Sequence, residues 1–201
     1  MTFPVDIARL LEPVDVQPFS PELAARFAEL LPTRRLLSAV ELEGLVRDTA
    51  RRGDLWRPLT IADPVRRRYE LLYEDEHLDV WVLSWMPGQK TGFHDHDISA
   101  VGLICVQGEL EEGQLTIGCA PSSIRMTPGV ARRGPGGYIH SVSHVAGEPA
   151  VSLHAYSPPL VRVGQYRVDD EGRLRREPEH GRRELQDGTI ALRNAPVSAT
   201  R

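Results

Sequence analysis

The first quarter of the chain carries two helical patterns, and short apolar segments come after them. Ser20-Pro21-Glu22 predicts the start of a helix, because serine caps a first turn, proline fits its first position and an acid favours its positive end. Apolar residues then recur at helical spacing as far as Pro32, at Leu23, Phe27, Leu30 and Leu31. The first helix is therefore expected to end at this proline.

A second helix is predicted after Ser38. The stretch Ser38-Ala39-Val40-Glu41 has the form of a capping box, in which serine and glutamate satisfy each other's free backbone N–H groups. Leu42, Leu45 and Val46 then fall on one face, and Gly53 marks the expected end. Both helices are expected to pack on the outside of the structure that the rest of the chain forms.

From Trp56 onward the helical spacing stops, and short apolar runs alternate with turn signals. Many short strands at near-regular spacing predict an antiparallel sandwich or barrel. The candidate strands are Tyr69–Tyr73, Leu78–Trp85, Val101–Val106, Gln114–Ile117, Ile124–Met126, Ile139–Val145, Val151–Tyr156 and Gln165–Val168.

The two ends of the chain differ from its middle. Residues 1–19 are punctuated by proline and predict an irregular lead-in, and the charged stretch after Asp169 predicts a peripheral hairpin followed by a loose end. We expect one domain over residues 1–201, with a helical segment at 1–55, a β-barrel core at 56–169 and a charged tail at 170–201.

Composition narrows the class of partner. The chain has 201 residues, 41% of them hydrophobic and 26% charged, with a net charge of −4. This balance favours neither nucleic acid nor a membrane as partner. Two cysteines, Cys105 and Cys119, make no disulfide framework. With no signal-like start and no long apolar run, we expect a cytoplasmic protein.

Three histidines carry the candidate chemistry. His94 and His96 stand two positions apart, and alternate residues of a strand point to the same face. His140 follows a second glycine-rich turn. Three imidazoles with no carboxylate among the obvious ligands predict a metal site at His94, His96 and His140.

The spacing around these histidines resembles the two motifs of the cupin superfamily. Gly88, five residues and then His94-Asp95-His96 resembles the first motif, and Gly108 stands where that motif closes. Gly129, five residues, Pro135-Gly136-Gly137, two residues and then His140 resembles the second. The resemblance implies a mainly β fold, a cupin double-stranded β-helix (jelly-roll-type) barrel with the N-terminal α-helices packed outside.

The chain departs from the general cupin pattern at one ligand. The first motif normally carries a glutamate shortly after its second histidine, where this chain has Ala100 and Val101. Within cupins that replacement resembles the thiol dioxygenases, such as cysteine dioxygenase. The resemblance implies Fe(2+) as cofactor, held by neutral imidazoles with about three positions open to substrate and dioxygen.

A second segment resembles the same family. AVSLHAYSPP at 150–159 is similar to the family's signature, and Ser152, His154 and Tyr156 alternate on one strand face. The resemblance implies that these three form a catalytic relay, with Tyr156 also near the substrate. A gap-free count from His94 puts the family's carboxylate-binding arginine at Arg68, although Arg66 and Arg67 leave the register open.

The family's mammalian members cross-link their active-site tyrosine to a cysteine. That cysteine position is Val101 here, and Cys105 lies four residues further on, so we expect no thioether cross-link. Cys105 is instead expected to be a buried small hydrophobe.

Several other candidates are expected to be structural. Trp81 and Trp85 should be core residues, and Arg132 and Arg133 a solvated loop. His77 and His180 are expected to be solvated. His144 is expected either to support the metal ligands from behind or to be solvated.

The resemblance thus implies a thiol dioxygenase that adds both atoms of O2 to the sulfur of a small thiol carboxylate, with L-cysteine as the first expectation. For the oligomeric state, which the resemblance does not set, a monomer is favoured. A related enzyme for 3-mercaptopropionate is the near alternative, and an arginine at the carboxylate clamp favours cysteine over it. A non-catalytic metal-binding cupin, or a cupin isomerase or lyase with another divalent metal, stays open because three-histidine sites also accept nickel, zinc or copper.

Overall fold

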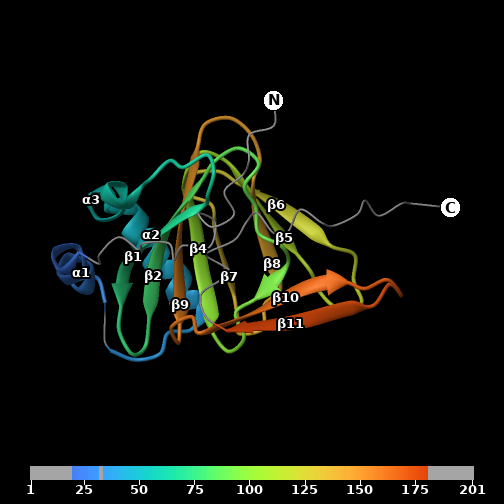
Figure 1. Ribbon diagram of the computed structural model, residues 1–201. Helices are drawn as coiled ribbons and strands as arrows, with labels where there is room; N and C mark the ends of the chain where they lie inside the picture. Colours follow the sequence, from blue (N-terminus) through green and yellow to red (C-terminus); the bar gives the residue numbers. More distant parts are fainter. Residues whose placement is uncertain (1–19, 32–33, 181–201) are drawn as a thin grey trace, which may run out of the picture.

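A computed structural model describes residues 20–31 and 34–180 of the chain (Figure 1). Both predicted helices are present, as α1 (Pro21–Ala28) and α2 (Ala39–Arg51). The Ser20 hydroxyl accepts a hydrogen bond from the backbone N–H of Leu23 and so caps the first turn of α1. At the start of α2, both hydrogen bonds of the capping box between Ser38 and Glu41 are present. The first helix ends at Ala28, earlier than predicted, and Pro32 and residues 1–19 lie outside the described residues. Two short helical turns that the sequence did not suggest come next, α3 (Gly53–Trp56) and η2 (Arg57–Leu59).

The rest of the described chain is mainly β, as predicted. The strands in chain order are β1 (Arg68–Glu74), β2 (Asp79–Trp85), β3 (His94–Asp95), β4 (Ala100–Gln107), β5 (Leu110–Gln114), β6 (Ser122–Met126), β7 (Ala131–Gly134), β8 (His140–His144), β9 (Ala150–Ser157), β10 (Arg162–Val168) and β11 (Leu174–His180).

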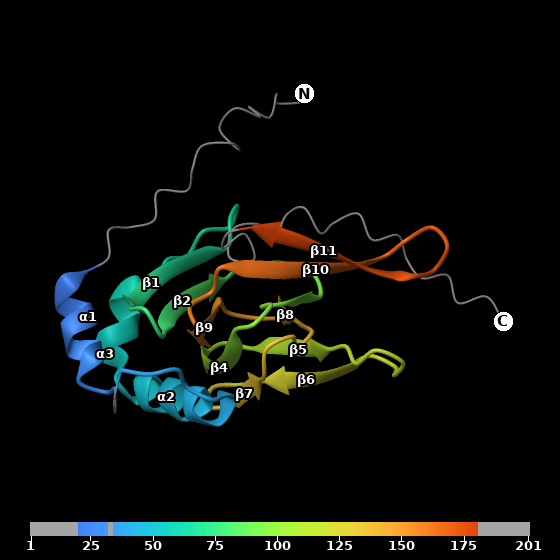
Figure 2. The same cartoon turned by 90° about the horizontal axis from the view of Figure 1, so that it is seen from below.

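These strands form two antiparallel sheets that face each other (Figures 1 and 2). One sheet has the order β1-β2-β9-β4-β7, and the other has the order β11-β10-β3-β8-β5-β6. Neighbouring strands are often distant in sequence, as where β9 inserts between β2 and β4. This interleaving brings residues from strands far apart in the chain to the space between the sheets.

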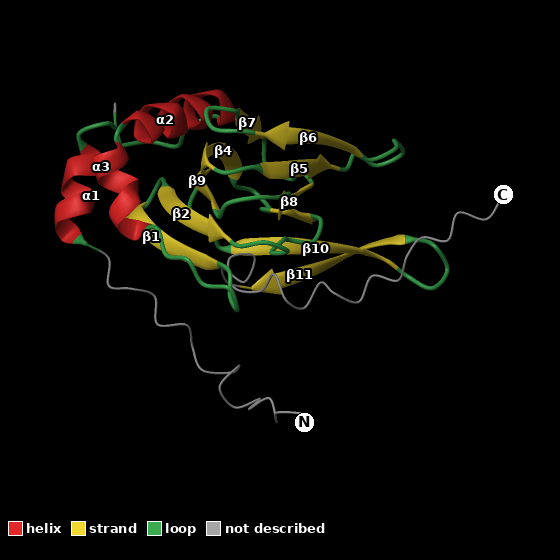
Figure 3. Ribbon diagram, turned by 90° about the horizontal axis from the view of Figure 1, so that it is seen from above, coloured by secondary structure: helices red, strands yellow, loops and turns green. Residues whose placement is uncertain are grey.

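Two apolar clusters hold this arrangement together. The first lies between the helices and the outer face of the five-stranded sheet, where α1 and α2 bury Phe27, Leu42 and Val46 against Val80 and Leu153 (Figure 3). The second fills the space between the two sheets. Burying apolar surface on both faces of one sheet makes that sheet the rigid centre of the molecule.

The helical layer lies close to the sheet because of one glycine. A Cβ atom at Gly102 of β4 would lie 2.5 Å from the backbone carbonyl carbon of Leu42 in α2. Real side chains do not approach so closely, so only glycine lets α2 rest directly on β4. The predicted position of the helices outside the barrel is thus confirmed and has a specific cause.

The structure corrects two predictions about strands. The predicted strand Gln114–Ile117 is wrong, because the strand is β5 and ends at Gln114. The expected loop at Arg132 and Arg133 is wrong too, since both lie in β7 and pair with Glu112 and Glu43. The charged inward residue Glu112 hid the alternation that would have marked β5.

The charged stretch after Asp169 contributes one strand, β11, which forms a hairpin with β10, so the hairpin begins earlier in the chain than predicted. It is not peripheral, because β10 also pairs with β3, the strand that carries the first histidine. The predicted loose end at 181–201 lies outside the described residues, and so does the side chain of His180.

Candidate metal centre

Three histidines converge in the space between the sheets. His94 lies in β3 and His96 just after it, and His140 begins β8, directly opposite His94 in the strand pairing. Their ring centroids are 4.7 to 5.1 Å apart, and one nitrogen from each ring lies within 4.8 Å of the other two. All three rings are buried. The predicted ligand set is therefore brought together and can hold a metal ion.

Backbone and side-chain acceptors fix how two of these rings face. His94 Nδ1 lies 2.9 Å from the carbonyl oxygen of Gly92, and His140 Nδ1 lies 2.9 Å from Glu112 Oε1. Since both partners are acceptors, each Nδ1 carries the proton and each Nε2 keeps its lone pair. His140 Nε2 is buried with no hydrogen-bond partner among the described residues. A metal ion fits such a lone pair.

Burial also keeps the third ligand neutral. It lowers the pKa of His140 to about 4, because an imidazolium would lose its hydration, although the hydrogen bond to Glu112 acts in the opposite direction. A neutral imidazole is the form that binds a metal. His140 is thus in the form that can bind a metal near neutral pH.

Glu112 is a residue of this centre that sequence reasoning missed. It lies in β5 with 0% of its surface exposed, and its carboxylate contacts His140, Arg132 and Tyr138. Burial alone would raise its pKa, but the hydrogen bonds from His140 and Arg132 hold that pKa below its ordinary value. The available signal in the sequence was that Glu112 stands two residues after the apolar Leu110, the spacing at which residues of a strand share a face.

Asp95 fixes β3, the short strand that carries His94 and leads directly into His96. Its carboxylate accepts two hydrogen bonds from Arg176 of β11, at 2.7 and 2.8 Å, and one from the Tyr166 hydroxyl at 2.7 Å. Burial would raise the pKa of Asp95, but Arg176 and Tyr166 hold it well below its usual range. The hairpin that looked peripheral in sequence therefore fixes the position of His94 and His96.

The predicted relay forms on β9, in the opposite sheet. Ser152 Oγ lies 2.9 Å from His154 Nε2, and His154 Nδ1 lies 3.1 Å from the Tyr156 hydroxyl. All three side chains are buried, and the Tyr156 ring lies 4.8 Å from that of His96, centroid to centroid. The hydrogen-bonded row thus reaches the metal centre across the gap between the sheets.

Trp85 gives this row a direction. Its Nε1–H donates to Ser152 Oγ at 2.9 Å, and an indole nitrogen can only donate. The Ser152 hydroxyl therefore has its own proton left for His154. Trp85 was expected to be a core residue and it is buried, but it also anchors the relay.

The structure does not bring Arg68 to the interior. Arg68 pairs with Glu70 at 2.9 Å, and alternation puts both on the face of β1 toward the helices. Its neighbour Arg67 is 5% exposed and its guanidinium lies over the Trp85 ring, 4.8 Å from the centroid. Arg67 is thus the arginine on the side of the histidines and the relay.

A pocket of about 570 Å³ adjoins the centre. His96 lines it from inside, and a mostly apolar rim with two acids and one arginine surrounds it: Ile98, Ser99, Pro158, Pro159, Val161, Glu76, Asp97 and Arg162. Its volume suits a small molecule. The pocket therefore borders the candidate centre at one of its three histidines.

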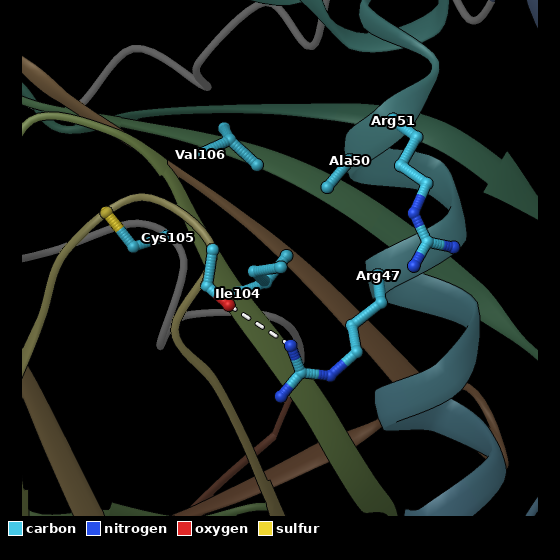
Figure 4. Close-up of a pocket in the computed structure, with 7 residues that line it drawn as sticks. Arg47, Ala50, Arg51, Ile104, Cys105 and Val106 are labelled. Carbon is cyan, nitrogen blue, oxygen red and sulfur yellow. Dashed lines mark hydrogen bonds between the residues drawn. The ribbon is translucent and has the colours of Figure 1, made fainter.

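A second pocket, of about 280 Å³, lies between α2 and β4 (Figure 4). Arg47 and Arg51 project into it from the helix, but Arg47 donates to the Gly129 carbonyl and to Glu43, and Arg51 pairs with Asp48. Cys105 also lines it, and burial raises the pKa of that thiol to about 11. The two arginines are thus already paired, and the Cys105 side chain belongs to the apolar cluster between the sheets.

Comparison with known proteins agrees with this centre. The family model for cysteine dioxygenase type I matches residues 16–169. This chain belongs to the cysteine dioxygenase type I family. The match spans both histidine motifs and the strand β9 that carries the relay.

Solved structures also resemble the chain, over about half of its length. A double-stranded β-helix protein from Klebsiella pneumoniae is 19% identical, with 51% of this chain and 80% of that chain covered and a TM-score of 0.46. A cupin from Desulfovibrio desulfuricans is 23% identical, with 48% and 87% covered and a TM-score of 0.42. TT1209 from Thermus thermophilus is 21% identical, with 51% and 92% covered and a TM-score of 0.45.

Mammalian relatives cross-link a cysteine to the active-site tyrosine, and the pairing of β4 with β9 shows which residue lies opposite that tyrosine in this chain. Val101 lies directly opposite Tyr156 in the pairing of β4 with β9, whereas Cys105 lies opposite Ser152. Cys105 is therefore four positions along the strand from the residue that faces the tyrosine. The absence of a thioether stays a prediction, and mass analysis of the intact protein tests it.

The remaining histidines lie away from the centre. His144 ends β8, four residues along the strand from His140; it is buried rather than solvated, and its Nε2 donates to the Glu148 carbonyl oxygen at 2.9 Å. His77 is partly exposed, beside Glu76. Within residues 20–31 and 34–180, no helix is both long and apolar enough to span a membrane.

Proposed function

We propose that this protein is an iron-dependent thiol dioxygenase that converts a small thiol carboxylate to its sulfinic acid, with L-cysteine as the first candidate. The reaction is RSH + O2 → RSO2H, in which both oxygen atoms end on sulfur. We further propose that it acts as a cytoplasmic monomer with one domain.

The observation that carries the proposal is the meeting of two groups across the sheets. A three-histidine centre lies on β3 and β8, and the Ser152–His154–Tyr156 row on β9 ends against the His96 ring. A site that only stored a metal would have no use for an oriented row of proton donors beside it. Family membership points to the same reaction.

The bound Fe(2+) would lower the pKa of the substrate thiol and supply the electrons that activate dioxygen. The protein's own residues hold the substrate in place. We assign the grip on the substrate carboxylate to Arg67, in place of Arg68, because a guanidinium can hold a carboxylate through two parallel hydrogen bonds. Trp85 beneath it limits where the guanidinium can lie.

The relay has a separate task. Trp85 donates a hydrogen bond to the Ser152 oxygen, and the Ser152 hydroxyl donates one to Nε2 of His154. The proton of His154 therefore sits on Nδ1, which can donate a hydrogen bond to the Tyr156 oxygen. The Tyr156 proton then points onward, where it can stabilise charge on the oxygen being transferred. The buried walls keep water out and strengthen these hydrogen bonds.

The test is oxygen uptake by the full-length protein after anaerobic loading with Fe(2+). L-cysteine and 3-mercaptopropionate are offered separately, and the sulfinate is identified by mass. The proposal expects one sulfinate formed per dioxygen consumed. Faster turnover of 3-mercaptopropionate would keep the reaction and change the substrate.

Two matched variants sharpen this test. His140→Gln removes a ligand and should abolish iron binding and turnover, whereas His144→Gln should leave both intact, because His144 lies four residues further along the same strand and is bonded to the Glu148 carbonyl. Iron bound at one equivalent without uptake of oxygen with either thiol would reject the dioxygenase and favour a metal-binding cupin. A different metal at full occupancy in untagged protein would favour the isomerase or lyase class.

A further inference from the structure

Glu112 is a buried carboxylate beside the metal centre that has no part in the reaction proposed above. It is fully buried in β5, and β5 lies between β8, which carries His140, and β6. A carboxylate so far from water is costly unless every oxygen has a partner. Its contacts therefore indicate what it is there to hold.

Each of these contacts has a defined direction. His140 Nδ1 donates to Glu112 Oε1 at 2.9 Å, and Arg132 Nε donates to Oε2 at 2.8 Å. The Tyr138 hydroxyl accepts from Gln114 Nε2 at 2.6 Å, so its own proton is available for Glu112 Oε1 at 3.2 Å. Glu112 thus receives three hydrogen bonds, and one comes from a metal ligand.

The anchor of this carboxylate comes from the facing sheet. Arg132 lies in β7, at the edge of the five-stranded sheet, whereas Glu112 and His140 lie in the six-stranded sheet. The ion pair fixes Oε2, so Oε1 is held toward the imidazole. An imidazole held in this way cannot rotate to offer its other nitrogen.

The charge matters as well as the orientation. The predicted ligands are three neutral imidazoles, so a divalent ion among them keeps its full charge in a dry site. Glu112 is a buried anion one hydrogen bond away from the ligand His140.

We infer that Glu112 is a positioning residue of the metal centre: it fixes His140 with Nε2 toward the ion and supplies the negative charge that the ligands lack. The inference rests on the metal site of the proposed function and is independent of its thiol substrate. It concerns ion binding, so it can be tested without turnover.

The first experiment measures the affinity of the full-length protein for Co²⁺ by competition with a chelator. Glu112→Gln keeps the size of the side chain and removes its charge, and we expect about 10- to 100-fold weaker binding, the usual cost of losing an outer-shell partner. Glu111→Gln is the matched control, because Glu111 precedes Glu112 on the same strand and is exposed. The control should bind Co²⁺ like the wild type.

A spectroscopic signal separates positioning from general damage. In the Co²⁺-loaded protein, ring N–H protons of ligating histidines give shifted, exchangeable proton NMR signals. Glu112→Gln should shift one of these signals or speed its exchange, while the signal of the His94 proton, which is bonded to the Gly92 carbonyl, stays in place. Glu112→Asp keeps the charge but shortens the reach to Nδ1, so it should bind Co²⁺ with intermediate affinity.

Two results would overturn the inference. One is a folded Glu112→Gln protein with wild-type Co²⁺ affinity and an unchanged set of exchangeable signals. The other applies if Glu112→Gln does not fold: wild-type affinity and signals in Glu112→Asp would then show that the bond to Nδ1 is not needed. A wild-type protein that binds Co²⁺ but oxidises no thiol would reject the proposed function and leave this inference standing.

Discussion

Arg176 donates two hydrogen bonds to the carboxylate of Asp95, which lies 81 residues earlier in the chain. Asp95 separates His94 from His96, and alternation turns its side chain away from the two imidazoles. The guanidinium is about one third exposed and the carboxylate nearly fully buried. The outermost strand of the six-stranded sheet therefore stabilises the ligand strand from behind.

Removing this grip should loosen the centre. Arg176→Gln leaves a buried carboxylate without its charged partner, so we expect a loss of about 2 to 3 kcal/mol in the free energy of unfolding. Metal affinity should fall as well, because β3 is only two residues long. Urea denaturation and Co²⁺ titration measure the two effects. Arg175→Gln is the control, since Arg175 is an exposed neighbour that pairs with Asp169, and equal losses in both variants would contradict the assignment.

Gly164 makes room for the same guanidinium. A Cβ atom at this position of β10 would overlap the Arg176 side chain. Gly164→Ala should therefore destabilise the protein in the wild type and much less in an Arg176→Ala background. A double-mutant cycle on unfolding free energies measures this coupling. Additive effects would mean that the glycine serves the backbone rather than the arginine.

The hydrogen bond from Trp85 predicts an effect on turnover without loss of substrate binding. Trp85→Phe keeps an aromatic ring beneath Arg67 but removes the Nε1–H donor to Ser152. We expect kcat to fall, KM to change little, and stability to drop by about 1 kcal/mol. Ser152→Ala should give a similar loss, and the double variant should lose no more than either single one. Independent losses that multiply would show that the two residues do not act as one row.

Substitutions at Arg67 and at Arg68 should have very different effects on KM. Arg67→Gln should raise KM for the thiol carboxylate by at least about tenfold, since a charged hydrogen bond of about 1.5 to 3 kcal/mol is lost. Arg68→Gln should leave KM near the wild-type value and lower only stability, because its partner Glu70 lies on the face toward the helices. Steady-state kinetics on both variants provide the comparison. A larger KM effect at Arg68 would restore the arginine chosen from sequence alone.

Acid should weaken the metal-free fold through His140. Burial lowers the folded-state pKa of this histidine to about 4 from an ordinary value of 6.5. Between these values the unfolded chain binds a proton that the folded chain does not, so stability falls as the pH drops from about 6.5 to 4. Urea denaturation in the presence of a chelator measures this slope. His140→Gln should flatten it, and an unchanged slope in that variant would assign the effect to other groups.

The centre was largely predictable from sequence because its ligands lie in local motifs. His94, His96 and His140 follow glycine-rich turns at fixed spacing, and Ser152, His154 and Tyr156 alternate along a single strand. Such patterns need no knowledge of which strands are neighbours. The helix caps at Ser20 and Ser38 were local too, and both form as predicted.

What the sequence did not indicate depends on pairing between distant strands. Arg176 and Arg132 look like ordinary members of basic runs, and only the sheet order brings them to Asp95 and Glu112. Arg68 was chosen by counting residues, but a shift of one position turns a strand residue to the opposite face. Counting residues cannot decide which face a residue of β1 is on, because the pairing of β1 with β2 is irregular.

The late position of Arg176 in the chain has a consequence for protein synthesis. All three histidines and the relay leave the ribosome before β11 does, yet the bond from Arg176 to Asp95 can form only after β11 has been made. A chain that stops short of residue 176 would carry every ligand and still hold them loosely. We therefore expect that the three histidines are firmly held only in a chain that extends through the C-terminal hairpin.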